Sequence, residues 1–180
     1  MTENSFPQDV VELVESHVRE VEDFPAPGVL FLDITPLIAD PVAFASLIEI
    51  LADRYRGKVD AVAGLESRGF ILGAPLAVAL GVGMVTVRKA GRLPGPVVGV
   101  DYDLEYGSAR MELQPFTVKD GDRVLVIDDV LATGGTADAA FQLIEAAGGV
   151  ADTLCVLLEL VDLGGRGRLH DRTVDSVLTY

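Results

Sequence analysis

Short apolar runs alternate with helix-forming segments along the middle of this 180-residue chain, and this alternation constrains the fold most strongly. The apolar runs read as buried strands and the segments after them as helices: 59–65 then 69–81, and 123–129 then 136–147. Elements that alternate in this way form a mostly parallel sheet flanked by helices. The sequence therefore predicts an α/β fold, in which ligands bind at the carboxyl ends of the strands.

Local signals predict the remaining elements. Proline and glycine forbid a helix at 24–31, which reads as a rigid loop leading into a short extended segment. Asp40 is placed to cap a helix that begins at Pro41. Residues 90–109 are rich in glycine and proline and read as a loop. Further helices are expected at 7–20 and 41–55, and further strands at 83–89, 108–118, 152–160 and 175–180.

Composition limits the classes of function. The formal net charge is −14, and such a surface repels nucleic acid phosphates, which disfavours a general role in DNA or RNA binding. No apolar run approaches the roughly 18–20 residues of a membrane span, and the acidic N-terminus lacks the features of a signal peptide. The single cysteine, Cys155, lies in an apolar run, which predicts a buried thiol and no internal disulfide. We therefore expect a cytoplasmic protein with no nucleic acid or membrane partner.

The segment VLVIDDVLATGGT, residues 124–136, carries the most specific signal for chemistry. Asp128 and Asp129 close a strand, and a loop of small residues then enters a helix N-terminus, where unsatisfied backbone N–H groups attract anions. The loop lacks the lysine of a Walker A motif. Ionised carboxylates only accept hydrogen bonds, so the two acids suit hydroxyl donors or a cation. A ribose 5-phosphate meets both requirements; the alternative is a plain turn with solvated aspartates.

A second strand-to-helix turn, GLESRGF at 64–70, repeats this arrangement. Ser67, Arg68 and Gly69 begin the helix, so the turn predicts a second anion site that also has a full positive charge. The alternative is a structural salt bridge made by Arg68. Two anion sites at the strand ends of one sheet suit a substrate with phosphates at both ends.

The segment RKAGRLPG, residues 88–95, places Arg88, Lys89 and Arg92 in a flexible stretch. These cations are either solvated surface groups or, together with Mg²⁺, groups that stabilise the charge of an anionic leaving group. Glu105 follows in YDLEYG. It is either a solvent-facing glutamate or, in a dry site beneath a lid, a proton donor or acceptor.

The segment FPAPGVLFLDITPL, residues 24–37, places Phe31 beside a backbone that prolines stiffen. Phe31 is either a core aromatic or a stacking platform for a base whose edge is read by neighbouring backbone N–H and C=O groups. His17 and His170 belong to no constellation, and no cluster of Cys and His indicates zinc.

These motifs, in this order, resemble the type I phosphoribosyltransferases and, within them, the adenine phosphoribosyltransferases. The resemblance extends from about residue 7 to residue 180. It implies the type I phosphoribosyltransferase fold as a single domain over residues 1–180. Within that domain it implies a small N-terminal hood at about 1–35 over the base site and a flexible catalytic loop at about 90–110. It also implies a cis peptide at Glu66–Ser67.

The resemblance assigns roles to individual residues. Asp128 and Asp129 would hold the ribose hydroxyls of phosphoribosyl pyrophosphate (PRPP). The loop around its 5-phosphate would comprise Ala132, Thr133, Gly134, Gly135 and Thr136. The pyrophosphate would contact Ser67, Arg68, Arg88, Lys89 and Arg92. Adenine would contact Val29, Leu30 and Phe31, and catalysis would involve Glu105, Tyr106 and Arg68.

The implied activity is Mg²⁺-dependent transfer of the 5-phosphoribosyl group from PRPP to adenine, giving AMP and pyrophosphate in purine salvage. Mg²⁺ would be held mainly by PRPP and water, with no direct protein ligand, and the family implies a homodimer. One departure is Leu32, where many relatives carry an arginine. The alternatives are a 6-oxopurine phosphoribosyltransferase, which typically carries an aspartate at the place of Ala132, and a non-catalytic regulator that senses PRPP. Glu105, the cations at 88–95 and the absence of a DNA-binding segment favour an enzyme.

Overall fold

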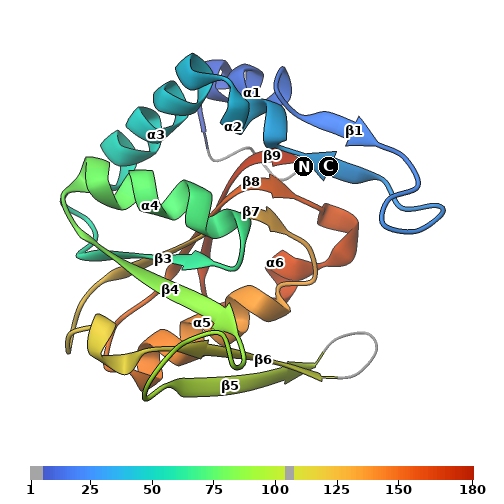
Figure 1. Ribbon diagram of the computed structural model, residues 1–180. Coiled ribbons are helices and arrows are strands. Elements are labelled where there is room, and N and C mark those ends of the chain that lie inside the picture. The colour runs from blue at the N-terminus through green and yellow to red at the C-terminus, as the bar shows by residue number, and fades with distance from the viewer. Residues whose placement is uncertain (1–5, 104–107) are drawn as a thin grey trace.

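The computed structural model describes residues 6–103 and 108–180 and contains a seven-stranded sheet in the order β5-β6-β4-β3-β7-β8-β9 (Figure 1). The hairpin of β5 (Val98–Asp103) and β6 (Ser108–Leu113) is antiparallel and extends the sheet beyond β4. The other strands run parallel: β4 (Gly83–Lys89), β3 (Ala61–Leu65), β7 (Val124–Leu131), β8 (Thr153–Glu159) and β9 (Thr173–Thr179). The prediction of an α/β fold with a mostly parallel sheet is confirmed.

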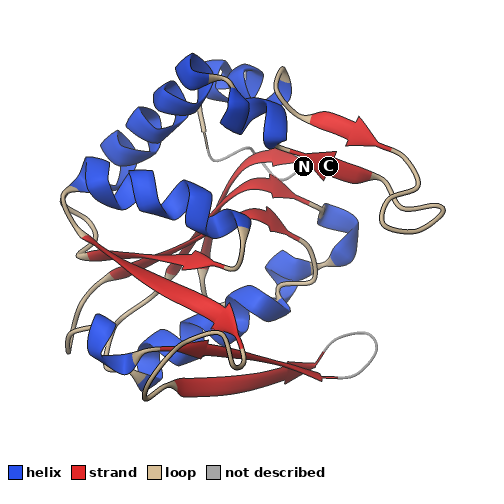
Figure 2. Ribbon diagram, in the orientation of Figure 1, coloured by secondary structure: helices blue, strands red, loops and turns tan. Residues whose placement is uncertain are grey.

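Helices cover both faces of this sheet (Figure 2). On one face lie α1 (Gln8–Glu15), α3 (Pro41–Tyr55) and α4 (Arg68–Leu80), and on the opposite face lies α5 (Gly135–Ala146). Each layer buries its apolar side chains against the sheet, so the described residues form two hydrophobic cores, one on either side of it. None of the helices in the described ranges combines the length and hydropathy needed to cross a membrane.

The central strand β7 shows why a continuous apolar run is needed here. Leu125 and Ile127 belong to the core beneath α3 and α4, whereas Val124 and Val126 belong to the core beneath α5. Successive side chains of a strand point to opposite faces, so a strand covered on both sides must be apolar at every position. Cys155 on the neighbouring strand is fully buried in the first core, as predicted.

Small residues let α4 lie close to the strands. A Cβ atom on Gly69 would come 2.6 Å from the carbonyl oxygen of Ile127, and one on Gly64 would come 2.7 Å from the carbonyl oxygen of Gly69. Only glycine permits backbones to approach this closely. The contact sets the N-terminus of α4, and with it Arg68, against the second half of β7.

The predicted start of α3 is confirmed. The Asp40 carboxylate accepts hydrogen bonds from the backbone N–H groups of Val42 and Ala43 at 2.9 and 3.0 Å, and Pro41 occupies the first helical position. These are the contacts that an N-cap aspartate makes with the unsatisfied donors of a helix. Four short helices had no clear signal: α2 (Thr35–Ala39), η1 (Pro115–Thr117), η2 (Val161–Leu163) and α6 (Gly165–Arg168).

The expected helix at 7–20 is wrong beyond residue 15. After α1 the chain forms strand β1 (Arg19–Val21), which pairs in antiparallel fashion with β2 (Phe31–Asp33). Arg19 Nη2 lies 2.7 Å from Asp33 Oδ2 across this pair, so an ion pair between distant residues joins the two strands. A helical pattern along the local sequence cannot reveal such a partner.

The expected loop at 90–109 is wrong for the segments that form the β5–β6 hairpin. Val98, Val100 and Tyr102 alternate along β5 and pack on the core beneath α5, which offsets the presence of glycine. The expected strand at 108–118 stops at Leu113, because Pro115 begins the turn η1. Glu105 and Tyr106 lie outside the described residues.

Candidate active site

The predicted phosphate-binding segments meet at the crevice between the carboxyl ends of β3 and β7. After β3 the chain enters α4 on one face of the sheet, and after β7 it enters α5 on the opposite face (Figure 1). The two connections diverge and leave an opening of the kind in which open α/β sheets bind ligands. Arg68 from the first connection lies beside Asp129 of β7, so both turns belong to one site.

The carboxylate of Asp129 is buried, and one of its oxygens accepts no hydrogen bond from the described residues. Its side chain is 5% exposed, and its Oδ2 lies 2.5 Å from Arg68 Nε. The approach lacks hydrogen-bond geometry, and within the described part of the chain this oxygen has no hydrogen-bond donor. Buried polar atoms in folded proteins almost always have a donor or acceptor partner. The arrangement therefore suits a ligand that brings a hydroxyl group to Asp129.

Asp128 has different surroundings from its neighbour. Its Oδ1 accepts the backbone N–H of Asp129 at 2.9 Å. Burial, and after it the charge of Asp129, raise the pKa of Asp128 well above its ordinary value, and Arg68 opposes this effect. Hydroxyl donors or a cation supplied by a ligand would favour the ionised carboxylate. The two acids thus form a site that gains stability when a diol or a cation arrives.

Arg68 links the acidic pair to the predicted base site. Its guanidinium carbon lies 5.0 Å from the ring centroid of Phe31, a distance typical of a cation–π contact. The Phe31 ring is also packed edge-on against Phe24, with centroids 5.1 Å apart and planes at 75°. The structure therefore brings Phe31, Arg68 and Asp129 into one continuous row, as expected if base, leaving group and ribose share a site.

The loop at 132–136 bounds a cavity of about 160 Å³ that Asp128 and Val130 also line. Gly134 has a φ of 80°, in the left-handed region that favours glycine, and α5 begins at the next residue. The first backbone N–H groups of α5 are therefore located at this loop. A cavity of this size at a helix N-terminus can hold a phosphate group.

The short helix α6 (Gly165–Arg168) forms one side of the loop at 132–136, which we call the α6 wall. It carries no sequence motif and was not predicted. A Cβ atom on Gly165 would overlap the carbonyl oxygen of Ala132, and one on Gly134 would come 2.8 Å from the carbonyl oxygen of Gly165. The short helix α6, which starts at Gly165, therefore lies directly against the loop. The adjacent glycines at 164–165 are the only local hint in the sequence that two backbones meet here.

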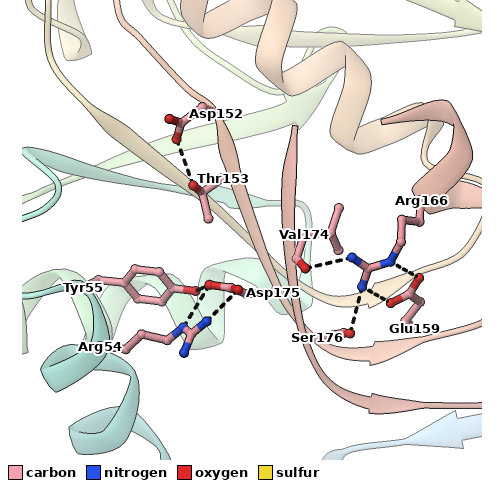
Figure 3. Close-up of polar contacts among 9 residues, drawn as sticks. All are labelled: Arg54, Tyr55, Asp152, Thr153, Glu159, Arg166, Val174, Asp175 and Ser176. Atoms are coloured by element: carbon pink, nitrogen blue, oxygen red, sulfur yellow. Dashed lines mark hydrogen bonds and ion pairs between the residues drawn. The ribbon is translucent and has the colours of Figure 1, made fainter. Parts of the chain in front are cut away.

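Arg166 holds this wall in place. Its Nε and Nη2 atoms bind the two carboxylate oxygens of Glu159 at 2.8 and 2.5 Å, and Nη1 donates to the carbonyl oxygen of Val174 at 3.0 Å (Figure 3). Nη2 also donates to the Ser176 hydroxyl at 3.1 Å. The hydrogen bonds from Arg166 lower the pKa of Glu159. Glu159 is buried and Arg166 is partly buried, and a bidentate pair of this kind has a fixed geometry, so it anchors α6 to β8 and β9.

The turn after β3 is tied to the end of β4 by Glu66. Its Oε2 accepts the backbone N–H of Lys89 at 2.9 Å and lies 3.5 Å from Arg88 Nε. The peptide between Glu66 and Ser67 is cis, as the resemblance implies. Arg88 also lies 5.7 Å from the ring centroid of Phe70 and is partly buried. Ser67, Lys89 and Arg92 are exposed, so they are available to a ligand.

The predicted base loop has internal hydrogen bonds, which limit the backbone groups that it can offer to a base. Val29 donates its backbone N–H to the carbonyl oxygen of Ala26 at 3.2 Å and accepts the N–H of Phe24 at 3.1 Å. Its N–H is therefore not available to a base, although its carbonyl oxygen has a second lone pair. Val29 and Leu30 are 43% and 49% exposed, as open ligand-contacting residues would be. Leu32 is buried in the core with α1 and α3 and does not replace an arginine contact.

The described residues contain no cluster of three or more His, Cys, Asp or Glu side chains suited to hold a metal ion. A larger cavity, of about 430 Å³, lies at the amino-terminal edge of the sheet rather than at the crevice. Arg54, Tyr55 and Asp175 line it, and Arg54 and Tyr55 both donate hydrogen bonds to the Asp175 carboxylate at 2.7–2.9 Å (Figure 3). We place the candidate site at the crevice, because only there do the acidic pair, the small-residue loop and Arg68 meet.

Comparison with known proteins agrees with this geometry. Residues 32–179 match the phosphoribosyl transferase domain family. An adenine phosphoribosyltransferase from Streptomyces galbus is 57% identical over 163 residues, which cover 90% of each chain.

Solved structures lead to the same family. Adenine phosphoribosyltransferase from Thermoanaerobacter pseudethanolicus has a TM-score of 0.90 and 44% identity and covers 94% of this chain and 99% of its own. The Saccharomyces cerevisiae protein, solved with D-2,5-dideoxy-2,5-imino-altritol 1,6-bisphosphate and adenine, has a TM-score of 0.89 and 37% identity, covering 96% and 100%. The chain therefore belongs to the adenine phosphoribosyltransferases, within the phosphoribosyl transferase family.

Proposed function

We propose that the protein transfers the 5-phosphoribosyl group of PRPP to adenine and releases AMP and pyrophosphate. The observation that carries this proposal is the meeting of three groups at one crevice. These are the acidic pair of β7, the phosphate-sized cavity at 132–136 and the guanidinium of Arg68. A phosphate, a diol and a second anionic group in one molecule match this order of sites, and PRPP has all three.

Asp128 and Asp129 would accept hydrogen bonds from the 2- and 3-hydroxyls of the ribose. Asp129 Oδ2 is buried and lacks a hydrogen bond within the described ranges, so a hydroxyl donor would satisfy it. The 5-phosphate would occupy the loop at 132–136, where the N-terminus of α5 provides backbone donors. Holding the sugar at two points orients its anomeric carbon toward the base.

Pyrophosphate would leave on the side of the crevice that carries Arg68. Lys89 at the end of β4 and Arg92 just after it are exposed, and Ser67 is the exposed residue that precedes α4. Mg²⁺ prefers phosphate, carboxylate and water oxygens. The ion would be held mainly by PRPP and water, and the carboxylate oxygens of Asp128 and Asp129 suit a cation beside the ribose. When bound, the ion neutralises charge that develops on the leaving pyrophosphate.

Adenine would stack on Phe31 at the mouth of the crevice. Arg68 now lies over this ring, so a base that stacks on the same face requires the guanidinium to move toward the pyrophosphate. We infer that the β1–β2 ribbon, with Val29 and Leu30 in the loop between its strands, forms a hood over the base. Glu105 and Tyr106, which lie between β5 and β6 in the sequence, would complete the site, with Glu105 as the proton-transfer group.

We also infer a homodimer. Val42 and Val78 are 74% and 82% exposed on α3 and α4, and Ile71 on α4 is 42% exposed. Between these helices lies an apolar depression of about 600 Å³. Exposed apolar surface that is concentrated in one place marks interaction sites. Analytical ultracentrifugation should give twice the mass of the chain, and a monomer at micromolar concentration would contradict this inference.

The experiment that tests the function is pyrophosphate release from PRPP and Mg²⁺ with adenine, hypoxanthine or guanine as the base. The amino group and N1 acceptor of adenine differ from the carbonyl and N1–H of the 6-oxopurines. Two mismatched buried polar groups cost about 1–3 kcal/mol each, so we expect kcat/KM to favour adenine by on the order of 10²-fold or more. Equal values for adenine and hypoxanthine would contradict the choice of base, a preference for hypoxanthine or guanine would identify a 6-oxopurine enzyme, and no release with any base would indicate a non-catalytic PRPP sensor.

A further inference from the structure

Tyr102 connects the β5–β6 hairpin to the phosphate loop. Its hydroxyl lies 3.3 Å from the Thr136 Oγ1, and either atom can donate the hydrogen bond. The residue is 9% exposed, and its ring packs so closely on α5 that a Cβ atom on Gly135 would come 3.0 Å from it. The hydroxyl is therefore held at the first turn of α5 by the packing of a rigid aromatic ring.

A bound phosphate would set the direction of this hydrogen bond. A phosphate dianion has no proton to donate, so Thr136 must donate its only proton to make a hydrogen bond with it. The Thr136 oxygen then remains as an acceptor, and the Tyr102 hydroxyl is the donor within reach. Hydrogen bonds in such a chain polarise one another, so the bond from Tyr102 to Thr136 strengthens the bond from Thr136 to the phosphate.

We propose that Tyr102 is a positioning residue for the 5-phosphate, acting through Thr136. This inference rests on the proposed function, since it takes the loop at 132–136 as the 5-phosphate site. Without the Tyr102 hydroxyl, the Thr136 hydroxyl is free to rotate and to direct its proton elsewhere. Binding of any ribose 5-phosphate group then weakens, whereas binding of the free base does not.

The test measures the Kd of ribose 5-phosphate by isothermal titration calorimetry for four proteins: wild type, Tyr102→Phe, Thr136→Val and the double variant. Tyr102→Phe keeps the ring that packs on Gly135 and removes only the hydroxyl. We expect Tyr102→Phe to raise the Kd by about 3–10-fold, the effect of one hydrogen bond. In the Thr136→Val background the same change should have almost no effect, because Tyr102 acts through Thr136.

Tyr55→Phe is the matched control. The Tyr55 hydroxyl is also buried and hydrogen-bonded, but to Asp175 at the amino-terminal edge of the sheet. This variant should lower the unfolding midpoint and leave the Kd of ribose 5-phosphate unchanged. Steady-state kinetics should agree, with KM for PRPP raised by Tyr102→Phe and KM for adenine unchanged.

The outcomes separate the inference from the proposed function. If wild type binds ribose 5-phosphate and Tyr102→Phe binds it equally well, the inference is wrong and the proposed function stands. Independent, multiplicative effects of Tyr102→Phe and Thr136→Val would likewise overturn the inference, because they would show that Tyr102 does not act through Thr136. If wild type neither binds ribose 5-phosphate nor uses PRPP, the proposed function fails and the inference fails with it.

Discussion

Asp128 and Asp129 are adjacent in sequence, yet their environments give them different properties. Asp129 lies beside Arg68, whereas Asp128 is bound to a backbone N–H and its pKa is raised by burial and by the charge of Asp129. A site that must attract hydroxyl donors retains this repulsion in the free protein, since ligand binding relieves it. The sequence predicts the pair and its chemistry, but not which member Arg68 contacts, because that depends on the approach of α4 to β7.

The raised pKa of Asp128 predicts how stability depends on pH. The folded protein keeps a proton that the unfolded chain releases at lower pH, so unfolding releases a proton between the two pKa values and rising pH destabilises the fold. Asp128→Asn keeps the acceptor for the Asp129 N–H and removes the charge. We expect its unfolding midpoint, without ligand, to exceed that of wild type by about 2–4 °C at pH 8, for about 1 kcal/mol of relief.

This advantage should shrink toward about pH 4, where the unfolded chain also keeps its proton. Asp129→Asn is the control, and differential scanning calorimetry of all three proteins makes the comparison. The Asp129→Asn control removes the ion-pair partner of Arg68 and should lower the unfolding midpoint at neutral pH. A stabilisation by Asp128→Asn that does not change between pH 4 and pH 8 would contradict the raised pKa.

At the scale of elements, local signals identify most of the sheet but not the contacts between distant segments. The strand at 61–65 is apolar throughout and the strand at 124–131 begins with four apolar residues, while 83–89 alternates apolar and polar residues; the N-cap of α3 is encoded in two adjacent residues. The β1–β2 ribbon and the β5–β6 hairpin depend on partners far along the chain or on a core that local composition does not reveal. The wall formed by α6 is of the same kind, since only the folded chain brings Gly165 to Ala132.

The α6 wall yields a prediction with a control in the same helix. A Cβ atom on Gly165 would overlap the carbonyl oxygen of Ala132, whereas one on Gly167 would meet nothing within 4 Å. Gly165→Ala should therefore displace the phosphate loop and raise KM for PRPP by on the order of tenfold, or about 1.4 kcal/mol. Gly167→Ala should leave KM unchanged. Equal KM values for both variants and wild type would show that the wall does not shape the loop.

At the scale of the whole molecule, an acidic protein gathers part of its few cations at one edge of its sheet. The net charge is −14, but Arg68, Arg88 and Lys89 all lie at the carboxyl ends of β3 and β4. The parallel sheet causes this grouping, because the parallel strands β3, β4 and β7 all end at the same edge. Sequence periodicity and motif chemistry predict the fold class, the binding of ligands at the carboxyl ends of the strands, and the phosphate loop. They do not predict the crevice, because it depends on how closely α4 approaches β7 in the folded chain.

The most direct test of this account is AMP formation from adenine, PRPP and Mg²⁺ by wild type and by the Asp128→Asn/Asp129→Asn double variant. The wild-type protein should form AMP and pyrophosphate in equal amounts. Hydrogen bonds to charged groups contribute about 1.5–3 kcal/mol each, so the loss of both carboxylates should lower kcat/KM by about 10²–10⁴-fold. Circular dichroism should show that the variant is folded. A folded double variant with kcat/KM within about threefold of wild type would contradict the assignment of the acidic pair to the ribose.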